Sequence, residues 1–123
     1  MGILSVAMAL LFAGCIAVEQ QPVQFSPVAS EQSSLPEHLD KKLDIQLNTG
    51  YTRTLKAGSM WTHFGRVAQG EVFKPYHDIF TVEGAHIHEA YLVVANNTLV
   101  GFYLPAEQSF SPLSQKISLS FSK

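Results

Sequence analysis

The sequence is poor in the features that cross-link or charge a small domain. Its 123 residues include one cysteine, Cys15, so the residues after it cannot form a disulfide with one another. Only 15% of the residues are charged, the formal net charge is −2, and like charges do not occur in long runs. Because nucleic-acid binding generally requires a concentrated basic surface, we expect no nucleic-acid partner.

Catalytic motifs are absent as well. No serine or cysteine lies in a recognisable nucleophile motif, and the glutamates show no spacing that indicates an acid–base pair. The glycines are isolated from one another and form no phosphate-binding loop. We therefore predict a protein that is not an enzyme and that needs no cofactor.

A long apolar run occurs only at the start of the chain, at residues 3–18. This run is shorter than the roughly 20 residues that span a bilayer, which favours an export signal over a permanent membrane helix. It leads into Phe12-Ala13-Gly14-Cys15, which resembles the lipobox of bacterial lipoproteins. The resemblance implies that residues 1–14 are a signal peptide. It also implies that Cys15 is lipidated, with palmitate incorporated, and becomes the mature N-terminus.

The residue that follows the cysteine influences the membrane to which a lipoprotein is sorted. In lipoproteins of enteric bacteria an aspartate after the cysteine favours retention in the inner membrane, whereas Ile16 occupies that position here. The resemblance therefore implies a protein of the bacterial cell envelope, anchored by lipid in the outer membrane and facing the periplasm. The alternative is ordinary signal peptidase cleavage after Ala17, which would release a soluble secreted protein.

Residues 15–40 are expected to be the lipid-anchored cysteine followed by a tether. From Glu19 to Glu37 the chain is rich in Gln, Ser and Pro and has no apolar period. Such a composition buries too little apolar surface to offset the entropy lost on ordering, so we expect this segment to be flexible. The folded domain is then expected to span residues 41–123.

From residue 43 the pattern becomes typical of β-strands. Residues 43–47 and 116–122 alternate strictly between apolar and polar side chains, whereas residues 105–114 are expected to be a loop. We predict an all-β domain of about six to seven short antiparallel strands, arranged as a small partly open barrel of SH3-like or similar type. A β-sandwich is the alternative.

The most apolar part of the domain is centred on a predicted hairpin. Asn96-Asn97 favours a tight two-residue turn, because asparagine tolerates a positive φ. With that turn, we expect Ala95 to face Thr98 and Val93 to face Val100. Both sides of the hairpin are apolar, so both are expected to be covered by other parts of the protein.

The sharpest local motif is a pair of histidines, His86 and His88. On a strand these two imidazoles point to the same side, and at that spacing they can chelate one metal ion, with His63 or His77 as a possible third ligand. The simpler interpretation is that they are polar residues at the entry to a buried strand.

Two functions remain open from the sequence. We favour a small envelope lipoprotein whose β domain is a non-enzymatic binding or structural module for another envelope component, most simply a protein. The alternative is a periplasmic metal-binding domain that uses the His86-X-His88 pair.

Overall fold

A computed structural model describes residues 16–28 and 35–123 of the chain. The expected signal peptide at residues 1–14 and the expected lipidation site Cys15 lie outside these residues. All regular structure in the described ranges is β, arranged antiparallel, which confirms the predicted fold class. Within the same ranges, no helix is long and apolar enough to cross a membrane.

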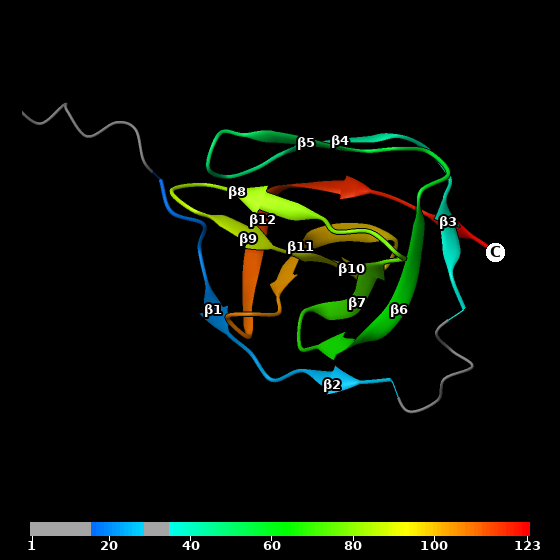
Figure 1. Ribbon diagram of the computed structural model, residues 1–123, viewed down its shortest axis with the longest axis horizontal. Helices are drawn as coiled ribbons and strands as arrows, with labels where there is room; N and C mark the ends of the chain where they lie inside the picture. Colours follow the sequence, from blue (N-terminus) through cyan, green and yellow to red (C-terminus); the bar gives the residue numbers. More distant parts are fainter. Residues whose placement is uncertain (1–15, 29–34) are drawn as a thin grey trace, which may run out of the picture.

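The largest unit is a nine-stranded sheet (Figure 1). Its strands are, in chain order, β1 (Gln21–Pro22), β2 (Ser26–Pro27), β3 (Glu37–Leu39), β6 (Met60–Val67), β7 (Gly70–Pro75), β10 (Tyr91–Ala95), β11 (Thr98–Leu104), β12 (Ser109–Ser118) and β13 (Phe121–Ser122). They are hydrogen-bonded in the order β1-β12-β11-β10-β7-β6-β3-β13, and β2 pairs with β6. Strand β13 follows β12 after two residues but pairs with β3, at the other end of the strand order. The sheet is therefore curved, although it does not close into a barrel.

Two smaller hairpins accompany this sheet. The first joins β4 (Leu43–Gln46) to β5 (Thr52–Leu55), and the second joins β8 (Thr81–Glu83) to β9 (Ile87–Glu89). The described residues therefore hold thirteen strands, more than the six to seven expected. The excess comes from β1, β2, β3, β8, β9 and β13, each of two or three residues, which are too short to produce a recognisable alternation.

The predicted central hairpin is present as β10 and β11. Asn96 and Asn97 have φ values of 53° and 58°, as a two-residue turn of the type that matches strand twist requires. Ala95 pairs with Thr98, which confirms the register next to the turn.

Farther from the turn the expected register is wrong, because a β-bulge shifts β11 by one residue. Val93 pairs with Gly101 instead of Val100. At position 101 an added Cβ would overlap the Ser111 carbonyl oxygen and the Phe110 ring, so only glycine allows β12 to approach this closely.

The first hydrophobic core lies between the main sheet and the two hairpins. It takes alternate side chains from β4 and β10 and includes Leu39, Ile45, Leu55, Trp61, Phe80, Leu92, Leu99, Phe102, Leu104 and Leu113. Residues 109–114, expected to be a loop, form the first half of β12 and contribute Leu113 to this core. Their serines and Pro112 hide the strand pattern in the sequence.

The second core lies on the other face of the central hairpin. It is built on Val72, Val93 and Tyr103 together with Val67, Tyr91 and Phe110. Phe25 covers it, with ring centroids 5.1 Å from Phe64 and 5.0 Å from Tyr103.

The expectation of a flexible tether at residues 15–40 is therefore wrong for the described residues in it. β1 pairs with β12, β2 with β6, and β3 with both β6 and β13. Val23 and Phe25 supply the cover that the second face of the hairpin needs, and burying them offsets the cost of ordering a polar segment. The folded unit thus begins before residue 41.

Candidate functional site

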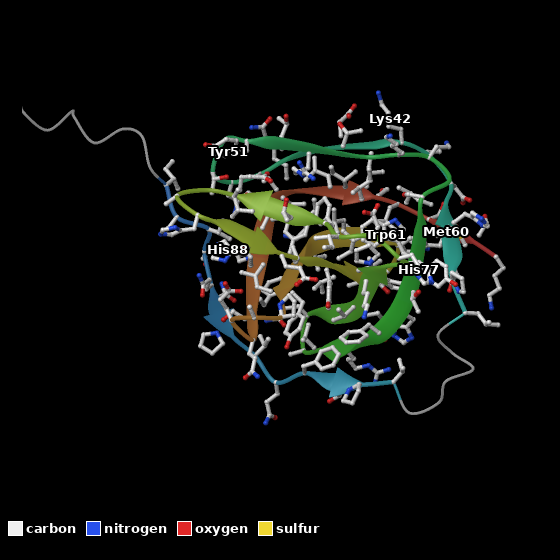
Figure 2. The ribbon with its side chains drawn as sticks, viewed as in Figure 1. Lys42, Tyr51, Met60, Trp61, His77 and His88 are labelled. Atoms are coloured by element: carbon white, nitrogen blue, oxygen red, sulfur yellow. The ribbon has the colours of Figure 1, made fainter. Side chains whose placement is uncertain are left out.

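A cleft with a volume of about 400 Å³ opens between β5, the start of β6 and the loop at residues 76–80. We call it the Arg53 cleft and define it by Arg53, Lys56, Met60, Trp61, Tyr76 and Phe80. Figure 2 shows Met60 and Trp61 at the side of the molecule away from Tyr51 and His88.

The floor of the cleft is aromatic and rigidly held. Trp61 and Phe80 are almost fully buried, and their rings meet edge to face at 6.0 Å. The indole Nε1 of Trp61 donates a hydrogen bond to Ser59 Oγ at 3.0 Å, and that hydroxyl donates to the Lys56 carbonyl oxygen at 2.7 Å. These bonds tie the end of β5 to the start of β6, so this part of the cleft is formed before any ligand binds.

The outer wall is the loop at residues 76–80. Its His77 has a left-handed φ of 54°, and its ring stands edge-on to Tyr76 at 4.2 Å. The Asp78 carboxylate accepts a hydrogen bond from the Ile79 amide at 2.8 Å, which stabilises the turn. Tyr76 and Ile79 remain exposed, so the cleft has an apolar rim.

The cleft contains two cationic side chains, Lys56 and Arg53, and the guanidinium of Arg53 has few hydrogen-bond partners. Its Nη1 lies 3.7 Å from Glu83 Oε2, which is too far for a hydrogen bond, and Glu83 Oε2 already accepts one from Thr81 Oγ1 at 2.9 Å. Arg53 Nε is buried without a partner among the described residues. The guanidinium carbon lies 5.3 Å from the centre of the Phe80 ring, within the range of a cation–π contact.

This arrangement suits recognition of an anion that carries an apolar group. A guanidinium presents N–H donors in a planar fork that matches a carboxylate, and Nε of Arg53 has no hydrogen-bond partner among the described residues. Trp61 and Phe80 offer an apolar surface beside that charge.

The histidines singled out in the sequence have different surroundings. His86 is exposed and precedes β9, whereas the side chain of His88 is mostly buried. His88 Nδ1 lies 2.7 Å from Glu107 Oε2, a residue of the β11–β12 connection that the sequence pattern did not single out. The second oxygen of Glu107 is buried and has no hydrogen-bond partner among the described residues.

The two expected candidates for a third metal ligand lie elsewhere. His63 Nε2 contacts Glu71 Oε1 at 2.8 Å, and His77 belongs to the Arg53 cleft loop, far from His88 (Figure 2). In residues 16–28 and 35–123, no three His, Cys, Asp or Glu side chains converge as a metal site would require.

A larger hollow, of about 530 Å³, adjoins the Asn96-Asn97 turn. Its cations are the exposed Lys41 and Lys42, and Lys42 is only 3.8 Å from the equally exposed Asp44. Exposed flexible lysines bind weakly, so we place the candidate site at the Arg53 cleft instead.

Sequence reasoning missed Arg53, although a signal is present. Arg53 and Leu55 lie two residues apart on β5 and therefore share a face, and Leu55 is buried. An arginine on the core-facing side of a strand needs either a partner or a ligand. No comparable sequence pattern predicts that residues 76–80 form the outer wall of the cleft.

In comparisons with protein-family models, curated proteins and solved structures, none matches this chain.

Proposed function

We propose that this protein is a lipid-anchored lipoprotein of the bacterial cell envelope whose β domain is a non-enzymatic binding module. In this proposal the lipid is attached to Cys15 and the domain faces the periplasm from the outer membrane. Its partner is another envelope protein, which inserts an acidic side chain or chain terminus into the Arg53 cleft.

The anchor is supported by the sequence alone. The apolar run at residues 3–18 contains small residues directly before Cys15, the only cysteine of the chain. Binding instead of catalysis is supported by the lack of nucleophile and acid–base motifs in the sequence.

The observation that carries the binding proposal is the state of Arg53. A buried N–H group without a partner typically costs 1–3 kcal/mol, so its presence beside an aromatic cleft calls for an explanation. A carboxylate in the cleft pairs with the guanidinium, whose side chain is 35% exposed, and the pre-formed aromatic floor keeps the entropic cost of binding low. Glu83 does not take this role, because its distance of 3.7 Å leaves the hydrogen bonds unmade.

The test is a titration with benzoate, which places a carboxylate on an apolar ring, and with benzamide, which has the same shape without the charge. Trp61 is the only tryptophan, so its indole N–H signal in NMR reports on the cleft unambiguously. We expect benzoate to shift this signal saturably and benzamide to shift it little. Arg53→Gln should weaken benzoate binding about tenfold or more, as the loss of a charge-assisted hydrogen bond predicts.

Arg66→Gln is the matched control, because Arg66 is exposed and its Nε already pairs with Glu71 at 3.0 Å. Arg53→Lys keeps the charge but loses the planar fork, so we expect intermediate binding. Equal shifts with benzoate and benzamide, or unchanged binding in Arg53→Gln, would refute the assignment of the cleft.

A further inference from the structure

Three segments that are distant in sequence meet at the end of the molecule where the described chain begins. The Ala85 amide donates a hydrogen bond to the Ile16 carbonyl oxygen at 2.8 Å. Thr49 Oγ1 donates to the Glu83 carbonyl oxygen at 2.5 Å. Gly84 lies at the junction, where an added Cβ would come within 2.9 Å of Ile16, Val18 and Thr49. The start of the described chain is therefore fixed against the β4–β5 and β8–β9 turns.

This end of the molecule exposes large apolar side chains. Ile16 is 57% exposed, Tyr51 in the β4–β5 connection is 54% exposed, and Ile87 at the start of β9 is 71% exposed. These are three of the six large apolar residues that are exposed within residues 16–28 and 35–123. We call Ile16, Tyr51 and Ile87 the N-terminal patch.

We infer that the N-terminal patch rests on the surface of a lipid bilayer. The inference rests on the proposed function, because the lipid on Cys15 brings the bilayer to this place. Ile16 is the next residue after Cys15 and is held by Ala85, so no flexible spacer separates the acyl chains from the folded domain. The surface around Ile16 must then face the membrane, and apolar side chains with a tyrosine suit the interface between headgroups and acyl chains.

The contact also orients the Met60–Trp61 end of the Arg53 cleft, whereas Arg53 itself follows Tyr51 by two residues. Tyr51 belongs to the patch, and Figure 2 shows Met60 and Trp61 of the cleft at the opposite side of the molecule. A domain that rests on the N-terminal patch therefore presents that part of the cleft away from the lipid, where a protein partner can reach it.

The test uses the full-length protein, purified from membranes and reconstituted in vesicles of phosphatidylethanolamine and phosphatidylglycerol. Ile87→Cys and Ile79→Cys provide single sites for an environment-sensitive dye, because a thioether-linked lipid leaves Cys15 without a free thiol. Ile79 is a matched control: it is an isoleucine with the same 71% exposure and lies in the Arg53 cleft. Thermal unfolding of both labelled proteins checks that the fold is retained.

We expect aqueous iodide to quench the dye at position 87 several-fold less than at position 79. Nitroxide-labelled lipid should quench the dye at position 87 several-fold more than the dye at position 79. Equal quenching at the two positions in protein whose intact mass shows the lipid on Cys15 would overturn the membrane contact while leaving the anchor in place. An intact mass without lipid would overturn the anchor, and the membrane contact with it.

Discussion

At the scale of single residues, carboxylates set the environment of two histidines, His88 and His63. His88 is in contact with Glu107, and its side chain is only 10% exposed. His63 shares Glu71 with Arg66. His88 and His63 thus each have a structural partner from another part of the chain. Neither contact supports the metal-binding alternative.

The first prediction concerns His88. His88→Ala leaves the partly buried Glu107 carboxylate without its hydrogen-bond partner, which should lower the free energy of unfolding by about 1–3 kcal/mol. His86→Ala is the control, because His86 is exposed, and it should change stability little. Chemical denaturation of both variants measures the difference. A strong rise in melting temperature on adding Zn²⁺, cancelled by His86→Ala, would contradict this interpretation and favour a metal site.

Arg53 shows how much of a residue's environment can be predicted from the sequence. Its position on the inner face of β5 is readable from alternation with Leu55. Its lack of a hydrogen-bond partner is not readable, because that depends on where Glu83 and Phe80 lie in the folded chain. The candidate site was therefore only partly predictable from the sequence.

At the scale of elements, local turn chemistry was predictable and non-local packing was not. The Asn96-Asn97 turn follows from the conformational tolerance of asparagine. The β-bulge beyond it arises where Gly101 packs on Phe110 of a neighbouring strand, and no residue within the hairpin encodes that contact. The ordering of residues 21–27 likewise depends on the distant face that Phe25 covers.

The second prediction concerns the last strand. Asp40 accepts hydrogen bonds from the hydroxyls of Ser120 and Ser122, which fasten the β13 region beside β3. The bonds from Ser122 and then Ser120 favour the ionised form and lower the pKa of Asp40 below its ordinary value of 3.8. The stabilisation is therefore fully present above pH 3.8 and is lost as the pH falls through the lower pKa of the folded state.

Comparison with Asp40→Asn isolates this effect. Its melting temperature should be lower than that of the wild type near neutral pH, and the gap should shrink once the pH falls well below 3.8. Differential scanning calorimetry over a series of pH values measures the gap. A gap that stays constant, or that widens in acid, would show that the serine bonds do not depend on ionisation of Asp40.

At the scale of the whole molecule, the all-β class followed from the alternation of apolar residues, while the extent of the folded unit did not. The sheet needs cover on both faces, and the chain meets that need with a polar-looking segment that the sequence pattern assigns to a tether. One consequence is that the domain begins directly after Cys15. A lipid there would bring the domain onto the membrane surface.

Metabolic labelling with radioactive palmitate is the most direct test of the lipid anchor on Cys15. Wild-type protein should carry the label and sediment with membranes, whereas Cys15→Ala should lose the label because the sulfur that carries the lipid is gone. Ser5→Ala is the matched control within the expected signal peptide, and it should retain the label. Label that never enters the wild-type protein, or that persists in Cys15→Ala, would contradict the account.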